Sequence, residues 1–303
     1  MAKNIPITKI GEFALIERFR KQLKTDSSVI VGSGDDCAVL EFNRDSYLLF
    51  TCDTIVEGID FTGKTPPYLI GRKSLALSLS DIAACAGIAR YALVTLGLPK
   101  KSSLRKIKEI SRGIFDLAKK YQVNIVGGDV SCAKQLFIDT SVLGTVEKKS
   151  LVLRKGAKKG DIIFVSGKLG GSIKGKHLKF TPRIKEARFL VKNFKLNSMI
   201  DISDGLIQDL AHILKLSRAG AFLYEELIPL AKQAFNIDDA LYAGEDFELL
   251  FTLSLGQARK LNAMKKKFPF WPIGEIVEQK YGLRLVDKKG RDKILKIKGF
   301  RHF

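Results

Sequence analysis

The chain has 303 residues, 46% of them hydrophobic, with 52 Lys and Arg against 32 Asp and Glu, a formal net charge of +20. This length and apolar content suffice for one large domain or two ordinary domains with substantial cores. No apolar run approaches the roughly 20 residues of a membrane helix, and residues 1–10 lack the apolar segment of a secretory signal. We therefore expect a cytoplasmic globular protein and no membrane partner.

The basic excess favours anionic partners and leaves two kinds open. One is a nucleic acid bound through its phosphates, and the other is a smaller anionic substrate. The Lys and Arg residues are dispersed in short clusters, and no RNA-binding motif accompanies them. A solvated basic surface is the favoured interpretation, and a nucleic-acid partner is not expected. The four cysteines lack the paired spacing of a zinc site or disulfide framework and are expected to be reduced.

The first half of the chain predicts alternating strands and helices. Residues 11–19 place apolar side chains on one helical face. Residues 67–87 begin at a proline and end near a glycine, and residues 103–121 repeat apolar side chains with a helical period, so both predict helices. The predicted strands, marked by apolar and β-branched residues between turns, fall within 29–42, 46–61, 90–98, 123–129 and 136–146.

The apolar pattern breaks at residues 147–161, where basic residues and glycines dominate. We therefore divide the chain into a domain of residues 1–147 and a domain of residues 148–303. The second half predicts mixed α/β structure again. Its segments are a strand at 162–167, a glycine-rich turn, a strand running into a helix over 199–217, a turn-bounded strand within 241–253 and an edge segment at 272–277.

The sequence GGSIKGKH, residues 170–177, nearly matches a phosphate-binding P-loop after a predicted strand. Gly170, Gly175 and Lys176 are in place. However, His177 stands where a Ser or Thr should bind Mg²⁺, and Pro182 follows too soon for the long helix that a P-loop needs. A glycine turn is favoured over a P-loop.

Acidic residues recur where predicted strands end or helices begin, beside glycine or serine. The adjacent Asp35 and Asp36, in the turn GSGDDC, repel each other unless a positive charge lies between them. Each carboxylate alone has an ordinary explanation as a helix cap or turn residue. Together they supply hard oxygen ligands, which suit Mg²⁺ held with substrate phosphates. The set is Asp35, Asp36, Asp53, Asp81, Asp129, Asp201, Asp204, Glu245 and Asp246.

Such a set of carboxylates predicts phosphoryl transfer from a nucleotide. In that reaction a protein mainly positions phosphates and neutralises their charge. Arg154, in LRKGAKKGD, is a candidate phosphate ligand because a guanidinium group binds phosphate oxygens in a forked geometry. A surface arginine in a linker explains the same residue equally well.

Several segments, in this order and spacing, resemble the thiamine-monophosphate kinase family, within the aminoimidazole ribonucleotide synthetase superfamily. The likeness covers nearly the whole chain and rests on GSGDDCAVL, TCDTIVEG, LSLSDIAACAG, VGGD, LRKGAKKGDIIFVSG, MIDISDGLIQDLAHI, AGEDFELLFT and the terminal KGFRHF. It implies an α/β (α+β), PurM-like fold of two domains. The N-terminal domain binds ATP and Mg²⁺ and contributes strands to a β-barrel that spans a homodimer, and the C-terminal domain is α/β.

The resemblance also implies an activity and its residues: transfer of the γ-phosphoryl group of ATP onto the phosphate of thiamine monophosphate, giving thiamine diphosphate. The acceptor phosphate attacks in line, so no nucleophilic side chain is needed. Substrate contacts fall on Glu245, Phe300 and Asp60. Nucleotide contacts fall on Gly128, Asp129, Arg154 and Ser203. Metal ligands fall on Asp36, Thr51, Cys52, Asp53, Asp81, Asp129, Asp201 and Asp204.

The chain departs from the family pattern near its implied site. Asp60 stands where the family usually has a histidine, and an ionised aspartate repels a phosphate. Cys52 replaces a hydroxyl residue, so a metal contact there requires its backbone carbonyl. The segment 167–183 is shorter than usual. Two alternatives stay open: an enzyme with the same ATP fold and a different acceptor, or a non-enzymatic basic protein that binds nucleic acid.

Overall fold

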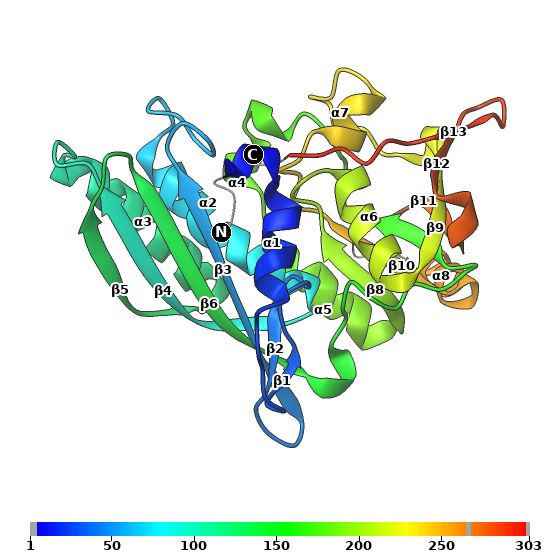
Figure 1. Cartoon of the computed structure of the whole chain (residues 1–303), viewed down its shortest axis with the longest axis horizontal. Helices are drawn as coiled ribbons and strands as arrows, with labels where there is room; N and C mark the ends of the chain where they lie inside the picture. Colours follow the sequence, from blue (N-terminus) through cyan, green and yellow to red (C-terminus); the bar gives the residue numbers. More distant parts are fainter. Residues whose placement is uncertain (1–4, 265–267, 301–303) are drawn as a thin grey trace.

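The computed structural model describes residues 5–264 and 268–300 of the chain. Figure 1 shows two units side by side, each with its own β-sheet and helices, which confirms the expected two-part α/β architecture. Residues 301–303, the end of the segment KGFRHF, lie outside the described residues. Within the described residues, none of the helices combines the length and the apolar character that crossing a membrane requires.

The N-terminal unit contains β1 Val29–Val31, β2 Ala38–Glu41, β3 Ser46–Val56, α2 Pro67–Ala84, β4 Ile88–Leu98, α3 Leu104–Tyr121, β5 Asn124–Cys132 and β6 Phe137–Glu147. Its six-stranded sheet has the order β1-β2-β3-β6-β4-β5. β4 and β5 run parallel and are joined through α3, whereas β3, β6 and β4 pair antiparallel. Every second residue of β6 is buried, so α2 and α3 cover one face of the sheet.

The helices α2 and α3 touch through their backbones. A Cβ atom on Gly71 would lie 1.9 Å from the carbonyl oxygen of Ile110, and one on Gly113 would lie 2.0 Å from that of Tyr68. Glycine at these two positions lets the helix axes approach more closely than side chains permit. α2 is buried over most of its length because the sheet, α3 and the C-terminal unit surround it. Its polar residues therefore face the boundary between the two units.

The C-terminal unit contains β7 Ile162–Val165, α4 Lys176–Lys179, α5 Ile184–Asn193, β8 Leu196–Asp201, α6 Leu206–Ser217, β9 Ala219–Tyr224, α7 Ile237–Tyr242, β10 Leu249–Leu253, α8 Leu255–Ala263, β11 Trp271–Glu278, β12 Leu283–Val286 and β13 Asp292–Ile294. Its seven-stranded sheet has the order β13-β12-β9-β11-β7-β10-β8. All five residues of β10 are buried, which explains its continuous apolar run. β8 ends at Asp201, beside α2.

One expectation for the C-terminal unit was wrong. The segment 272–277 is no edge strand, because β11 lies between β9 and β7. Its Pro272 is tolerated there at an irregularity, since the pairing register with β7 shifts between Pro272 and Gly274. The strand expected within 241–253 is confirmed as β10, and a loop separates it from the end of α7 at Tyr242.

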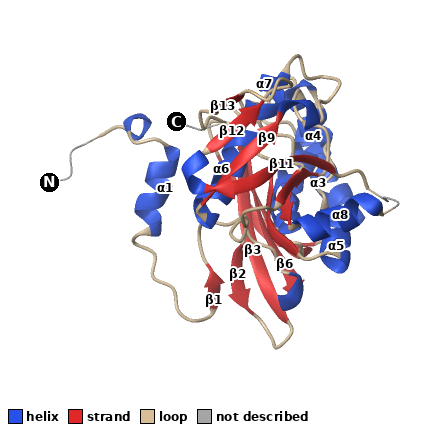
Figure 2. Ribbon diagram, turned by 90° about the vertical axis from the view of Figure 1, so that its right-hand side faces the viewer, coloured by secondary structure: helices blue, strands red, loops and turns tan. Residues whose placement is uncertain are grey.

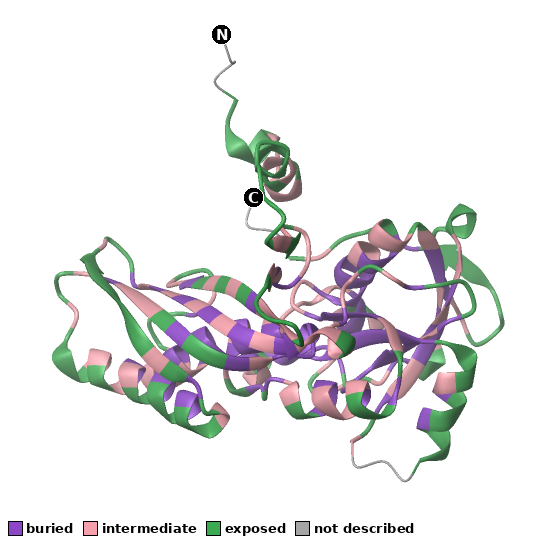
Figure 3. Ribbon diagram, turned by 90° about the horizontal axis from the view of Figure 1, so that it is seen from below, coloured by how far each residue is buried: buried purple, intermediate pink, exposed green. Residues whose placement is uncertain are grey.

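The predicted N-terminal helix is present as α1, Glu12–Arg20. Figures 2 and 3 show it standing away from both sheets. The ring of Phe13 meets that of His212 of α6, with 5.4 Å between the ring centroids. At the other end of the chain, the segment after β13 runs back toward the boundary between the units (Figure 1). The C-terminal end of the described chain thus approaches the region where the two units meet, whereas α1 projects from the molecule.

The close crossing of α2 and α3 generates a stability prediction. Gly113→Ala should destabilise the protein by about 2 kcal/mol or more, although alanine favours a helix by up to ~1 kcal/mol, because its Cβ overlaps the Tyr68 carbonyl. Gly256→Ala in α8 is the matched control, since a Cβ there meets nothing within 4 Å. Chemical denaturation of the two variants checks this, and equal stabilities would contradict the close approach.

Candidate active site

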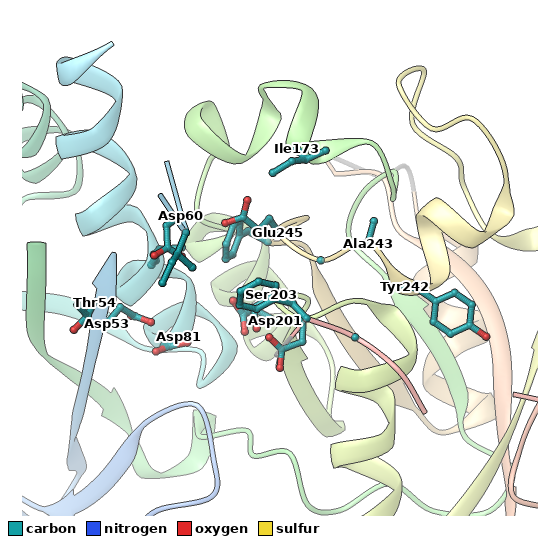
Figure 4. Close-up of a pocket in the computed structure, with 17 residues that line it drawn as sticks. Asp53, Thr54, Asp60, Asp81, Ile173, Asp201, Ser203, Tyr242, Ala243 and Glu245 are labelled. Atoms are coloured by element: carbon teal, nitrogen blue, oxygen red, sulfur yellow. The ribbon is translucent and has the colours of Figure 1, made fainter. Parts of the chain in front are cut away.

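A cleft of about 530 Å³ lies between the two units. Figure 4 shows Asp53, Asp60 and Asp81 on the wall formed by the N-terminal unit, with Ser203 and Glu245 on the opposite wall. β3 and α2 supply the first wall, and the loops after β8 and α7 supply the second. Residues 299–300 close one side of the cleft. The structure thus brings together side chains that lie up to about 250 positions apart along the sequence.

Three carboxylates form a cluster at one end of the cleft. Oxygens of Asp36, Asp81 and Asp201 all lie within 4.8 Å of one another. Asp36 precedes β2, Asp81 lies in the last turn of α2, and Asp201 ends β8, so each comes from a different element. Asp36 and Asp201 are buried, and Asp81 is half-buried. We call these three residues the carboxylate cluster.

Hydroxyl groups hold the acidic side chains of the cleft in place. Thr51 donates to Asp81 with 2.5 Å between the oxygens, and Ser80 donates to Asp201 at 2.6 Å. Ser78 donates to Asp53 at 2.7 Å. Ser78 and Ser80 are site residues that the sequence patterns do not single out. Their position on α2, just before Asp81, is the signal that points to them.

Arg154 supplies the positive charge that the adjacent Asp35 and Asp36 require. Its guanidinium donates to Asp36 Oδ1 at 2.7 Å, and its backbone N–H donates to Asp35 Oδ2 at 3.1 Å. Arg154 therefore belongs to the carboxylate cluster as its charge partner, and the interpretation as a surface linker arginine was wrong. Asp36 Oδ2 and Arg154 Nε are both buried without a hydrogen-bond partner among the described residues. These two atoms remain available to a ligand.

Burial raises the pKa of four acidic side chains in and beside the carboxylate cluster. Burial, followed by the charge of Asp36, raises the pKa of Asp35 to about 7 and that of Asp201 to about 7. Burial also raises the pKa of Asp53 to about 6 and that of Asp81 well above its ordinary value. The cluster is thus a place where a cation is strongly favoured.

A buried ion pair lies at the other end of the cleft. The ammonium group of Lys73, whose side chain is 0% exposed, contacts the Glu245 carboxylate and donates to the backbone carbonyl of Asp60 at 3.0 Å. Glu245 has a positive φ of 64°, which non-glycine residues seldom adopt. The Asp60 carboxylate accepts the backbone N–H of Val56 at 2.7 Å and so closes its own turn. The sequence patterns do not single out Lys73.

Three further predicted residues, Ser203, Asp204 and Phe300, also line the cleft. The backbone carbonyl of Ser203 accepts the N–H of Glu245 at 2.6 Å, and that of Asp204 accepts the N–H of Phe300 at 3.1 Å. These two bonds join the loop after β8 to the loop after α7 and to the end of the described chain. The second wall and the segment that closes one side of the cleft are therefore connected through their backbones.

Gly128 and Asp129 lie apart from the carboxylate cluster within one chain. They line a second hollow of about 350 Å³ between α3 and strands β4 and β5. In the sheet register Asp129 pairs with Thr95, Thr95 with Asp139, and Asp139 with Thr54, so three strand spacings, roughly 14 Å, separate Asp129 from β3. The Asp129 carboxylate accepts the hydroxyl of Ser131.

The side chain of Cys52 points away from the cleft. Successive residues of a strand alternate between faces, and Cys52 is exposed on the face opposite to Thr51 and Asp53. Its thiol does not join the carboxylate cluster.

The segment GGSIKGKH forms a glycine turn, as the sequence favoured, and no P-loop. Gly170 and Gly171 have positive φ, and the following helix α4 has only four residues. The backbone N–H of Gly170 donates to the buried Asp246 carboxylate, so it is not offered to a phosphate. Lys176 pairs with the buried Glu248 at 2.9 Å. Charged side chains of the protein itself thus occupy this turn.

The raised pKa of Asp201 gives a pH-dependent stability prediction. A carboxyl whose pKa is raised by folding contributes stability that is present below pH about 4 and is lost as the pH rises through about 7. Asp201→Asn keeps an acceptor for Ser80 but removes the charge. The metal-free variant should therefore melt about 2–4 °C above the parent at about pH 8 and equally near pH 4. Thermal melting with a chelator checks this, and a lower Tm for the variant at about pH 8 would sink the explanation.

Comparison with known proteins places the chain in a family. Residues 34–146 match the model of the AIR synthase related protein N-terminal domain, and residues 141–286 match that of the C-terminal domain. The thiamine-monophosphate kinase of Buchnera aphidicola subsp. Schizaphis graminum (strain Sg) is 38% identical, covering 97% of this chain and 99% of the relative. That of Bacillus subtilis (strain 168) is 32% identical, covering 97% and 100%.

A solved structure of AaThiL complexed with AMPPCP and TMP matches this fold with a TM-score of 0.87 and 28% identity, covering 100% of both chains. The sequence and structural likenesses thus both extend over the two units and the cleft between them. The chain belongs to the thiamine-monophosphate kinase family.

Proposed function

We propose that this protein transfers the γ-phosphoryl group of ATP onto the phosphate of thiamine monophosphate, giving thiamine diphosphate and ADP, with Mg²⁺ as the metal. The observation that carries the proposal is the carboxylate cluster at one end of a cleft large enough for organic phosphates. Two matched relatives bear the name thiamine-monophosphate kinase, and the matched structure AaThiL is complexed with AMPPCP and TMP, which supports the same activity.

The residues of the cluster fit Mg²⁺. They offer carboxylate oxygens, which are the ligands that this ion prefers, and Asp36 Oδ2 is buried without a hydrogen-bond partner among the described residues. When bound, Mg²⁺ neutralises phosphate charge and orients the phosphates for transfer. We assign the ion or ions to Asp36, Thr51, Asp53, Asp81, Asp201 and Asp204, and restrict Cys52 to its backbone carbonyl. Asp129 is kept as a ligand on the family resemblance alone, because within one chain it lines a separate hollow.

The chain's own groups position the reactants. Arg154 is held by Asp35 and Asp36, so its guanidinium is fixed before a phosphate arrives, and its Nε has no partner among the described residues. Hydroxyls of α2 and β3 fix the carboxylates in the same way. Such preorganisation lowers the reorganisation needed during transfer. An oxygen of the acceptor phosphate attacks the γ-phosphorus, ADP leaves, and no side chain forms a covalent bond.

We keep the nucleotide contacts at Gly128, Asp129, Arg154 and Ser203. Ser203 is supported by its place in the lining of the cleft, and Arg154 by its ion pair with Asp36 of the carboxylate cluster. Gly128 and Asp129 rest on the family resemblance, and within one chain they line a separate hollow. The proposed nucleotide contacts therefore rest most firmly on Arg154 and Ser203.

The acceptor remains thiamine monophosphate despite the aspartate at position 60. Because the Asp60 carboxylate accepts the N–H of Val56, one of its oxygens is turned toward its own backbone. That oxygen already has a donor of the protein itself and is not the one directed at a phosphate in the cleft. Glu245 and Phe300, the other two proposed substrate contacts, line the same cleft as Asp60. An acidic cleft also disfavours the alternative in which the chain binds nucleic acid there.

Product analysis tests the proposed reaction. The purified protein, incubated with ATP, Mg²⁺ and thiamine monophosphate, should form thiamine diphosphate and ADP in equal amounts, and EDTA should stop both. Asp53→Asn should lower kcat by about 100-fold or more, since it removes a charge from the cleft. The control Asp287→Asn alters an exposed pair with Arg291 and should keep normal turnover. Near-normal turnover in Asp53→Asn would exclude this carboxylate from the site.

We also propose that the protein is a homodimer formed through the open face of the N-terminal sheet. Phe50 and Tyr91 flank Leu143 in one row across β3, β6 and β4, and Leu93 lies one step along β4. Phe50, Tyr91 and Leu93 are each between 45% and 49% exposed. A monomer seldom exposes so large a continuous apolar surface, and a second copy carries the same surface.

Light scattering with size-exclusion chromatography tests the dimer. The protein should have twice the chain mass of 33.7 kDa. Phe50→Asp with Leu93→Asp should give a monomer, because two charges would be buried in the interface. Phe115→Asp, on the exposed side of α3, is the control and should remain dimeric. A monomeric parent protein would contradict this proposal.

A further inference from the structure

We propose that Lys73 is a positioning residue that shapes the acceptor half of the cleft by holding Glu245. This inference rests on the proposed kinase function and extends it to a residue that has no assigned role there. The Lys73 side chain is 0% exposed, which is unusual because lysine is almost never buried without a partner. Its ammonium contacts the Glu245 carboxylate and the Asp60 carbonyl.

The position of Lys73 on α2 separates it from the carboxylate cluster. Lys73, Leu77 and Asp81 are spaced by four residues and therefore lie on one face of the helix, and the last two line the cleft. Eight residues of helix span about 12 Å, so Lys73 lies at the opposite end of this face from the cluster. Its charge is too far away to serve a metal or the phosphates held there.

The partners of Lys73 come from the two opposite walls of the cleft. Asp60 follows β3 in the N-terminal unit, and Glu245 follows α7 in the C-terminal unit (Figure 4). Lys73 thus ties the walls together at this end. It also holds Glu245 in its positive-φ conformation, in which the side chain faces the cleft. Because Lys73 contacts the backbone of Asp60, the side chain at position 60 does not determine this tie.

The chemistry of this end suits the acceptor more than the nucleotide base. Asp60 and Glu245 bring two carboxylates, and Lys73 balances one of them, so a net negative charge remains. Aromatic and aliphatic side chains surround these groups, including Ile59, Phe247 and Phe300. Thiamine monophosphate carries a cationic thiazolium ring, whereas adenine is uncharged. A cationic aromatic ring matches both the charge and the apolar surroundings.

Kinetics of a double-mutant cycle test the inference. Lys73→Met keeps the length of the side chain and removes its charge, and Glu245→Gln keeps the shape of its partner. Lys73→Met should raise KM for thiamine monophosphate about tenfold and leave KM for ATP within about twofold. If Lys73 acts through Glu245, the double variant should raise the acceptor KM no more than Glu245→Gln alone. Lys106→Met, which removes a partly exposed pair with Glu57, should change neither KM.

The outcomes separate this inference from the proposed function. A parent protein that forms no thiamine diphosphate overturns the function and this inference with it. An active parent with an unchanged acceptor KM in Lys73→Met overturns the inference alone, as does an equal rise in both KM values. If Lys73→Met does not fold, the double variant of Lys73→Met with Glu245→Gln replaces it, because that variant carries no unpaired Glu245 carboxylate. A further tenfold or so rise over Glu245→Gln would then show a separate role and overturn the coupling.

Discussion

Carboxylates gathered away from water repel one another, and this repulsion is the constraint on which the cleft depends. The carboxylate cluster joins three elements of two units, and among the described residues Arg154 is the cation that contacts it. Burial raises the pKa of Asp201 to about 7, so the metal-free site opposes full ionisation at neutral pH. A bound cation relieves that cost. In the proposed function, the same arrangement that opposes ionisation of the cluster favours a metal ion there and, through the metal, phosphates.

The fold supplies this arrangement mainly through α2. Glycine contacts bring α3 against its outer side, the sheet covers another side, and the C-terminal unit covers the side that carries Lys73, Ser80 and Asp81. One rigid helix thus sets the positions of Lys73 and of Asp81, about 12 Å apart, at the two ends of the cleft that we propose for the acceptor and the metal. β3 and β8 carry the remaining carboxylates to the same helix. Rigid elements hold such groups more accurately than loops do.

Local patterns predicted the helices α1, α2 and α3 and the alternation of strands, because apolar periodicity reflects burial directly. They misplaced β11, since Pro272 indicates an edge and only the pairing register shows the irregularity that accommodates it. The resemblance led to the cleft residues. It did not lead to Lys73 or Ser78, because the roles of these residues depend on partners 172 and 25 positions away. The resemblance also included a residue whose side chain does not reach the cleft. The neighbours of Cys52 in sequence face the cleft, but the alternation of side chains along β3 turns its thiol away.

The most direct test of the central claim is anomalous diffraction from crystals soaked with Mn²⁺ and a non-hydrolysable ATP analogue. Mn²⁺ prefers the same oxygen ligands as Mg²⁺ and can be located by its anomalous signal. The account predicts Mn²⁺ bound between Asp36, Asp81 and Asp201, and loss of that peak in Asp81→Asn. Mn²⁺ bound elsewhere in the cleft, or a peak that persists in the variant, would contradict the claim that this cluster is the metal site.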